Sequence, residues 1–177
     1  QPIYRKDYEP SSHLIRTTEL DFDLGDSETI VSSRISFYKN PDINKKIDKL
    51  FLNGESLELM SIKIEGLTVN YDLKDDGLFI LNPPDNFILE VQVRIHPESK
   101  TDLNGLYQSS GNFCTQCEAM GFRQITYYLD RPDVLSIFTT KISANRGNYP
   151  VLLSNGNLVN ETTSQVIWHD PAPKPCY

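Results

Sequence analysis

The sequence predicts an all-β domain in which twisted antiparallel sheets pack face to face. Apolar residues recur with a period of two, and turn-forming residues separate these runs. No stretch sustains a helical apolar stripe for three turns. A chain of 177 residues can bury a substantial core, and it contains neither internal repeats nor an obvious linker. We therefore expect residues 1–177 to form a single β domain.

The first expected element is a hairpin near the N-terminus. Leu20, Phe22 and Leu24 alternate with acidic residues, and the turn-forming run 25–27 follows them. Residues 31–37 again place apolar side chains on one face. Because the two alternating runs are separated only by turn formers, they are predicted to pair with each other.

A second hairpin is expected around Asn53-Gly54. This dipeptide readily takes the positive φ angles of a tight type I′ turn, and Leu50 and Leu52 lead into it. Residues 57–64 would form the return strand. Its apolar phase changes partway, which predicts a bulge near Ser61.

The remaining strands are predicted from shorter runs of the same kind. Residues 89–95 alternate most cleanly, and strands are also expected at 67–71, 78–80, 138–142, 151–154, 158–159 and 166–168. Residues 151–154 and 158–159 flank the turn-forming run 155–157 and should form a hairpin. At most one short helical turn is expected, between Leu129 and Ile137.

The composition argues against two classes of partner. The chain has 17 Lys and Arg residues, 24 Asp and Glu residues, a net charge of −7 and no basic cluster, which argues against a nucleic-acid partner. No apolar run reaches the roughly 18 residues of a membrane span. The 3 cysteines are an odd number, so they cannot form a complete internal disulfide framework. We therefore expect a reducing, cytoplasmic setting.

The segment 105–133 is the most informative part of the chain. It combines aromatic residues, cysteines, a lone acid and turn formers without a regular period, which is typical of a site. Cys114 and Cys117 form a C-x-x-C pair that could be a redox couple, half of a zinc site, or two small side chains packing a loop. Packing is favoured, because no thioredoxin-like strand–helix pattern and no second pair of clustered ligands accompany them.

Two further groups have competing interpretations. The run Asp130-Arg131-Pro132-Asp133 could read substrate charge, but a structural turn with a capping aspartate is favoured. The three histidines, His13, His96 and His169, are dispersed, and no H-E-x-x-H motif occurs. The sequence therefore predicts no metal site within this chain.

Several blocks of the chain, in order, resemble the N-terminal β domain of the bacterial-type aminopeptidase N family, which are zinc metallo-aminopeptidases of the gluzincin group. The matching residues are 52–55, 105–109, 114–119, 121–123, 125–134, 138–142, 149–150, 152–157, 170–171 and 173–177. The central blocks read Gly-Leu-Tyr-Gln-Ser, Cys-Thr-Gln-Cys-Glu-Ala, Gly-Phe-Arg and Ile-Thr-Tyr-Tyr-Leu-Asp-Arg-Pro-Asp-Val.

The resemblance implies a saddle-like β-sandwich that belongs to a larger, multidomain enzyme. In this family the zinc ligands, the general base and the G-A-M-E-N exopeptidase motif lie in the catalytic domain that follows. We therefore expect this chain to be a fragment that ends at Tyr177, holds no zinc and is inactive alone. It should pack against that catalytic domain, and the parent enzyme should remove N-terminal residues from peptides with a free amino terminus.

Glu118 and Gln116 are the expected substrate-binding residues. From residue type alone, Glu118 is an ordinary solvated loop acid, although Cys117 and Met120 beside it could desolvate it. The resemblance assigns this carboxylate to the substrate's amino group, which it would hold by charge-assisted hydrogen bonds. Gln116 lies two residues earlier, on the same side of an extended backbone, and is expected to assist. Otherwise its amide satisfies loop backbone.

Two other functions remain open on the sequence. The domain could be a free-standing β-sandwich interaction module without catalytic activity. A redox protein built on Cys114 and Cys117 is a third interpretation, and it requires a depressed thiol pKa.

Overall fold

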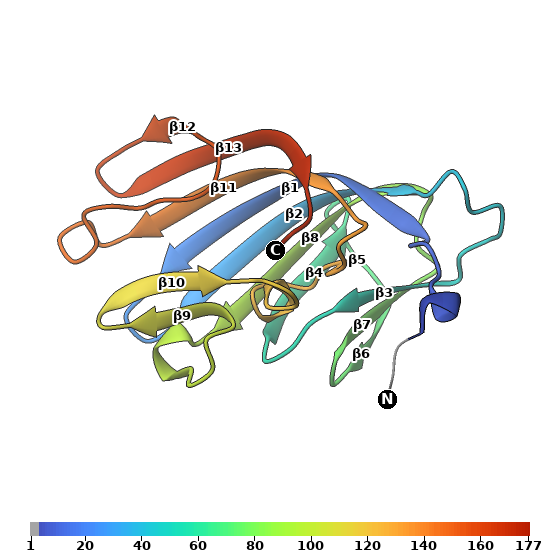
Figure 1. The fold of residues 1–177 in the computed structure, drawn as a ribbon, viewed down its shortest axis with the longest axis horizontal. Coiled ribbons are helices and arrows are strands. Elements are labelled where there is room, and N and C mark those ends of the chain that lie inside the picture. The colour runs from blue at the N-terminus through green and yellow to red at the C-terminus, as the bar shows by residue number, and fades with distance from the viewer. Residues whose placement is uncertain (1–3) are drawn as a thin grey trace.

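A computed structural model describes residues 4–177 of the chain. Within these residues the secondary structure consists of strands β1 to β13 and three single turns of 3-10 helix (Figure 1). None of these helical turns has the length and apolarity needed to cross a membrane. The all-β prediction is confirmed.

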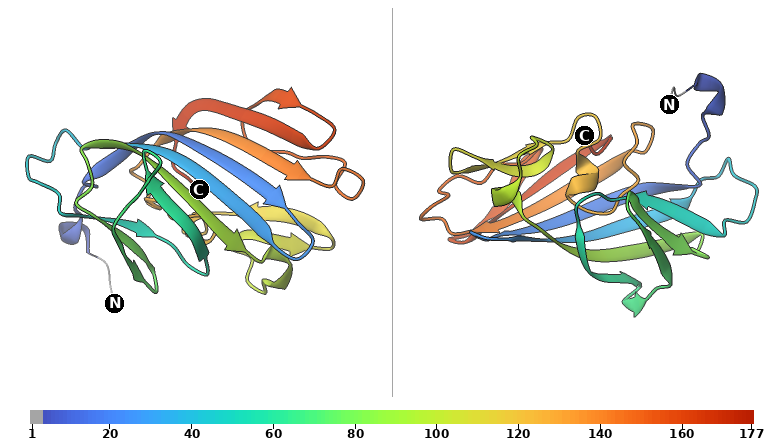
Figure 2. Two further views of the ribbon diagram at one scale, coloured as in Figure 1. Left: turned by 180° about the vertical axis from the view of Figure 1, so that it is seen from behind. Right: turned by 90° about the horizontal axis from the view of Figure 1, so that it is seen from below.

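The largest element is a twisted sheet of eight strands, which Figure 2 shows from two further sides. Its strands are, in order, β12 (Asn157–Glu161), β13 (Gln165–Lys174), β11 (Ser136–Ala144), β1 (His13–Leu24), β2 (Thr29–Lys39), β8 (Asn86–Ile95), β4 (Glu58–Ile64) and β5 (Leu67–Thr68). The pairing is antiparallel except between β1 and β11, which run parallel. A purely antiparallel sheet was predicted; these two strands are far apart in sequence, so no tight turn fixes their relative direction.

The hairpin predicted near the N-terminus is confirmed. Strands β1 and β2 pair with Leu20 opposite Ser33 and Phe22 opposite Val31. The amide of Gly25 donates to the carbonyl of Glu28 at 3.0 Å and closes the turn. The alternating apolar side chains face the core, as a period of two requires.

Two small sheets complete the domain. One contains β3 (Lys49–Asn53), β7 (Gly77–Leu81) and β6 (Tyr71–Lys74), and the other is the hairpin of β9 (Gly105–Ser109) and β10 (Asn112–Gln116). Buried residues of both join one hydrophobic cluster with those of the large sheet, including Leu52, Leu78 and Leu106. The small sheets therefore cover the apolar face of the large one, as in a sandwich.

The hairpin predicted around Asn53-Gly54 is wrong, although the bulge in its expected return strand is real. Strand β3 pairs with β7, and β4 belongs to the large sheet. The backbone of Asn53 exchanges hydrogen bonds of 2.8 and 3.0 Å with Tyr128, so this strand continues toward a distant segment instead of turning back. The pairing of β4 with β8 shifts register between Leu59 and Ser61, which confirms the predicted bulge.

The hairpin predicted from residues 151–154 and 158–159 is also wrong. Residues 151–154 form no strand; β12 pairs with β13 instead. The carbonyl of Leu152 accepts a hydrogen bond from Trp168 Nε1 at 3.2 Å, so a side chain satisfies the backbone there. Between residues 129 and 137 the chain forms one hydrogen-bonded turn, in which the amide of Val134 donates to the carbonyl of Arg131 at 3.3 Å. The three 3-10 turns lie elsewhere, at η1 (Arg5–Asp7), η2 (Pro97–Ser99) and η3 (Phe122–Gln124).

Candidate functional site

The segment 105–133 begins with a hairpin that the sequence interpretation missed. Strands β9 and β10 pair with Ser109 opposite Asn112. The two residues between them, Ser110 and Gly111, have φ angles of 50° and 79°. Positive φ at both central positions is what a type I′ hairpin turn requires, and Ser110-Gly111 was the local signal for it. The hairpin places Gln116 at its end, opposite Gly105.

A tight turn follows the hairpin directly and carries Glu118. The amide of Gly121 donates to the carbonyl of Cys117 at 2.9 Å, so the three residues between them form the tip of the turn. The peptide bond between Glu118 and Ala119 is cis. A Cβ atom on Gly121 would lie 2.3 Å from the carbonyl oxygen of Gln116 and 3.0 Å from Cys117 Cα. Only glycine fits this close approach of two backbone segments.

Glu118 and Gln116 are both exposed to solvent. The apolar neighbours do not cover them, because Met120 is itself 62% exposed and Phe122 is buried in the core. The expectation that adjacent residues of this chain desolvate the carboxylate is therefore wrong. The turn instead presents an exposed carboxylate, which is free to contact a ligand or another protein surface.

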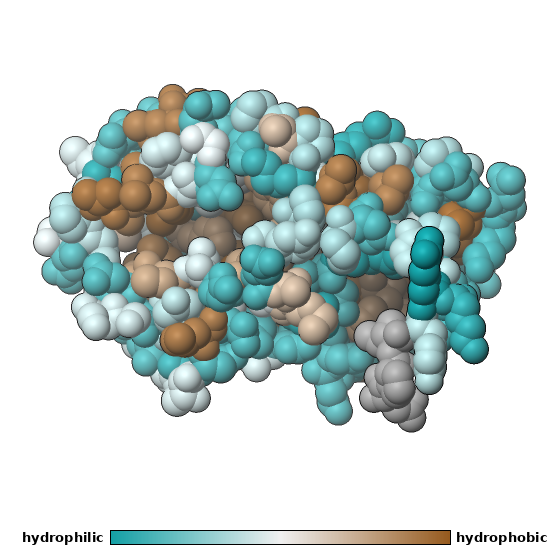
Figure 3. Space-filling view, in the orientation of Figure 1, coloured by the Kyte–Doolittle hydropathy of each residue, from teal (hydrophilic) through white to brown (hydrophobic). Residues whose placement is uncertain are grey.

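A large groove lies beside the turn, between strand β10 and the β1–β11 face of the large sheet. Its volume is about 800 Å³, and Figure 3 shows apolar side chains in the hollow. Gln116 lines this groove and Glu118 does not. The apolar part of the lining includes Leu20, Phe22, Phe113, Phe138 and Ile142. The two predicted site residues therefore face different surroundings, even though they are two residues apart.

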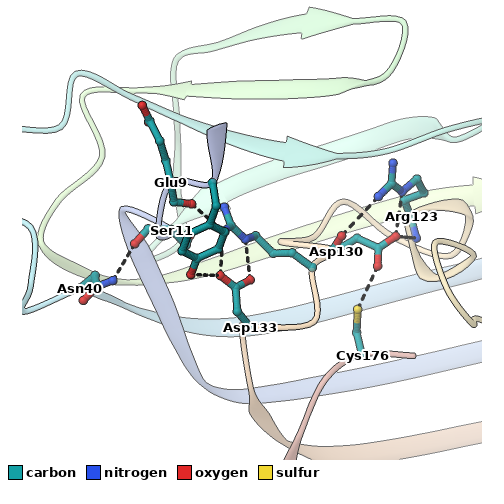
Figure 4. Close-up of polar contacts among 9 residues, drawn as sticks. Glu9, Ser11, Asn40, Arg123, Asp130, Asp133 and Cys176 are labelled. Atoms are coloured by element: carbon teal, nitrogen blue, oxygen red, sulfur yellow. Dashed lines mark hydrogen bonds and ion pairs between the residues drawn. The ribbon is translucent and has the colours of Figure 1, made fainter. Parts of the chain in front are cut away.

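A buried ionic network lies next to the turn (Figure 4). Asp130 Oδ2 accepts hydrogen bonds from Arg123 Nε at 2.8 Å and from the Arg123 amide at 3.2 Å. The side chain of Asp130 is only 1% exposed, and that of Arg123 is 14% exposed. On its other side Arg123 faces Glu55 at 3.6 Å. Asp130 thus contacts protein groups, which favours the structural interpretation of this residue over a reader of substrate charge.

The three cysteines are free thiols. Burial raises the pKa of Cys117 to about 11, and the nearby Asp130 carboxylate acts in the same direction. Cys176 Sγ donates to Asp130 Oδ1 at 3.2 Å, and burial likewise raises its pKa. A redox couple needs a lowered thiol pKa, so Cys117 is unsuited to that role. No three His, Cys, Asp or Glu side chains within residues 4–177 are arranged to hold a metal ion.

The histidines have structural surroundings. His13 is buried at the start of β1, where its Nε2 lies 3.1 Å from the carbonyl of Pro84. Its ring contacts Phe87 edge-on. Burial lowers the pKa of His13. His96 is exposed and follows β8, and His169 lies on β13 with Nδ1 2.9 Å from the hydroxyl of Thr139.

Fold and site together define an all-β sandwich domain that displays a tight, exposed turn at the end of a hairpin. Comparison with known proteins then identifies its family. The family model for the peptidase M1 N-terminal domain matches residues 8–177. The chain belongs to this family, which confirms the resemblance seen in the sequence.

Its relatives include aminopeptidase N of Escherichia coli, which is 44% identical over 183 residues and matches 100% of this chain. Aminopeptidase N of Caulobacter vibrioides is also 44% identical, over 185 residues and 100% of this chain. The match covers 21% of each relative, so the chain spans about a fifth of their length.

Solved structures agree with this assignment. Aminopeptidase A of Legionella pneumophila, in complex with aspartic acid, superposes with a TM-score of 0.91 at 32% identity, over 97% of this chain and 21% of that one. Leukotriene A4 hydrolase of Saccharomyces cerevisiae gives a TM-score of 0.77 at 21% identity, over 100% of this chain and 31% of that one. At that identity the second likeness shows a shared fold.

Proposed function

We propose that this chain is the substrate-anchoring N-terminal domain of a zinc aminopeptidase that removes N-terminal residues from peptides. Family membership and the aminopeptidase relatives support the class of enzyme. The observation that carries the assignment of the site is the exposed carboxylate of Glu118 on a turn that is closed by the bond between Gly121 and Cys117. A carboxylate on a closed backbone turn is suited to bind an α-ammonium group.

The described residues are not suited to hold the zinc ion themselves, because they bring no three metal-ligating side chains together. The zinc and the groups that act on the scissile bond are therefore assigned to another part of the parent protein. When bound there, zinc polarises a carbonyl and activates water. The contribution of this chain is to bind and orient the substrate.

The proposed anchor acts through charge and position. A substrate amino terminus carries a positive charge over much of the neutral range, and Glu118 would accept hydrogen bonds from it. Gln116, which lines the groove and ends strand β10 two residues before Glu118, would assist through its side-chain amide. Holding the amine fixes which peptide bond reaches the catalytic groups, because only the first bond lies one residue away. An acylated amino terminus offers no cation and would be rejected.

The exposure of Glu118 adds a requirement to this proposal. An exposed carboxylate attracts a cation weakly, because water screens the interaction. Strong binding therefore needs a second surface that covers the turn. We assign that role to the catalytic domain of the parent protein, against which this domain would pack.

The experiment is a kinetic comparison in the full-length protein. Glu118→Ala should cost on the order of 2–5 kcal/mol on free-amine substrates such as alanyl p-nitroanilide, which is roughly 30-fold to 4,000-fold in kcat/KM. Glu90→Gln, on strand β8 of the large sheet, is the control and should retain wild-type kinetics. Residues 1–177 alone, with zinc added, should give no hydrolysis. Wild-type kinetics for Glu118→Ala would contradict the proposal.

The cellular setting is also a proposal. All three cysteines are free in the structure, which supports the reducing, cytoplasmic compartment expected from the sequence.

A further inference from the structure

The short turn η3 follows the Glu118 turn without any linker. Gly121, whose amide closes the Glu118 turn, is also the residue that precedes η3. The amide of Gln124 donates back to the carbonyl of Gly121 at 3.1 Å. Gly121 itself has no space for a Cβ atom against Gln116. A displacement of η3 must therefore move the backbone that carries Glu118.

Three residues, Asp130, Glu55 and Lys100, hold η3 through polar contacts, and those of Asp130 are the most buried. Its carboxylate binds both the amide and the guanidinium of Arg123, and Arg123 Nη2 also donates to the Asp130 carbonyl at 3.3 Å (Figure 4). The amide of Glu55 donates to the Arg123 carbonyl at 2.9 Å. Lys100 Nζ donates to Gln124 Oε1.

The Asp130–Arg123 contact is well suited to fix a geometry. An aspartate with a nearly fully buried side chain cannot exchange its partner for water. Two of the three hydrogen bonds that its carboxylate accepts come from the backbone and the side chain of Arg123, so they restrain both the position and the orientation of η3, and the third comes from Cys176. Neither Asp130 nor Arg123 lies on a strand of the large sheet.

We propose that Asp130 is a positioning residue that acts through Arg123 and η3 to hold the Glu118 turn in the orientation that binds the substrate amine. This inference rests on the proposed function of Glu118. It assigns a functional consequence to a carboxylate that does not touch substrate itself.

The test is a double-mutant cycle in the full-length protein, with kcat/KM measured on alanyl p-nitroanilide. Asp130→Asn keeps the size of the side chain and removes the charge that binds Arg123. It should lower kcat/KM by roughly tenfold to a hundredfold, mainly through KM, because small displacements of a binding group are costly. In a Glu118→Gln background the same change should have less than about a twofold effect, because the anchor is already lost.

A matched control is Asp133, which lies three residues after Asp130 in the run Asp130-Arg131-Pro132-Asp133. Asp133 forms an exposed pair with Arg131 at 2.6 Å and accepts a hydrogen bond from Tyr8 at 2.8 Å, and it has no contact with η3 among the bonds of the described residues. Asp133→Asn removes an equivalent charge three residues away and should leave kcat/KM within about twofold of wild type.

The outcomes separate the two proposals. If Glu118→Gln lowers kcat/KM and Asp130→Asn lowers it equally in both backgrounds, Asp130 acts independently and the positioning role is overturned. An unchanged kcat/KM for Asp130→Asn alone would overturn it as well. If Glu118→Gln itself behaves as wild type, the amine anchor fails and the positioning role fails with it. Should Asp130→Asn not fold, as judged by circular dichroism, Arg123→Lys takes its place in the same cycle. That variant keeps the charge but loses the paired contacts.

Discussion

The large sheet and the segment 105–133 reach their structures by different means. The sheet is held by continuous backbone ladders and by side chains that alternate between core and solvent, such as Val31 and Val93 on paired strands. The segment has only one short ladder, between β9 and β10. Beyond it, the backbone is held by one isolated bridge to Asn53, by glycine close approaches, by buried apolar side chains such as Phe122 and Ile125, and by the pair of Asp130 and Arg123.

This difference separates stability from function within one domain. Loss of an apolar contact in the sheet affects the whole cooperative fold, because its core is contiguous. Loss of one polar contact in the segment affects a local orientation. We therefore expect sheet variants to change the free energy of unfolding more than catalysis, and segment variants to do the opposite.

The largest effect on stability is expected at Leu89, which is fully buried on β8. Leu89→Ala removes apolar contacts and leaves a cavity, and it should lower the free energy of unfolding by about 2–5 kcal/mol. Urea unfolding measures this loss. The kcat and KM of the protein that remains folded should be unchanged, and a selective rise in KM would break the separation between the two regions.

Compared with Leu89→Ala, Gly121→Ala should lower the free energy of unfolding less and the activity more. The added methyl group would collide with the Gln116 carbonyl, so the backbone must shift, at a cost of about 1–3 kcal/mol. That shift displaces Glu118. Expressed as free energies, the loss in kcat/KM should exceed the loss in the free energy of unfolding. Gly111→Ala is the control: Gly111 has φ of 79° but open space around it, so it tests strain without displacement of the site. Equal kinetic effects of the two variants would contradict this account.

Tyr128 connects the two regions, and its substitution should have a smaller effect on stability. It lies in the segment, yet its hydroxyl group is 2.7 Å from Thr18 Oγ1 on β1 of the large sheet. Thr18 is also 2.9 Å from Ser136 Oγ, so Tyr128→Phe leaves it one partner and should cost about 0.5–1.5 kcal/mol of stability. Thermal unfolding with Tyr127→Phe as control measures this. A loss beyond that range would indicate that the two regions are coupled more strongly than described.

The smallest effect is a pH dependence that comes from the large sheet. Because burial lowers the pKa of His13 in the folded state, the unfolded chain takes up a proton first as pH falls below about 6.5. Stability should therefore be complete above that pH and decline as pH falls toward the folded pKa. His13→Gln should flatten this part of the curve of melting temperature against pH. Parallel curves for wild type and variant would contradict the assignment.

The fold was largely predictable because its signal is local. Leu20 and Phe22 alternate on their own strand, and so do Val91 and Val93, whatever the partner strand is. Which strands pair with each other was harder to predict from the sequence. Asn53-Gly54 is a strong local turn signal, but the backbone of Asn53 pairs with Tyr128, and no local pattern reports a contact so distant in sequence.

The residues of the proposed site follow from resemblance to the family, and their geometry could not be predicted from the sequence. Glu118 and Gln116 were assigned by resemblance, and the structure places one outside the groove and the other at it. The pair of Arg123 and Asp130 was missed because an irregular seven-residue spacing carries no periodic signal. Gly121 was missed for a related reason. The Gln116 carbonyl that leaves no room for a Cβ atom at Gly121 comes close to it only after the chain folds.

The central claim is that Glu118 recognises the substrate's amino group. The most direct measurement compares two inhibitors of the full-length protein that differ only in that amine, an alanyl amide and its des-amino propionyl analogue. Wild type should bind the amine far more tightly, and Glu118→Gln should lose most of that preference while it binds the des-amino analogue as wild type does. An undiminished preference for the amine in Glu118→Gln would show that another group holds it.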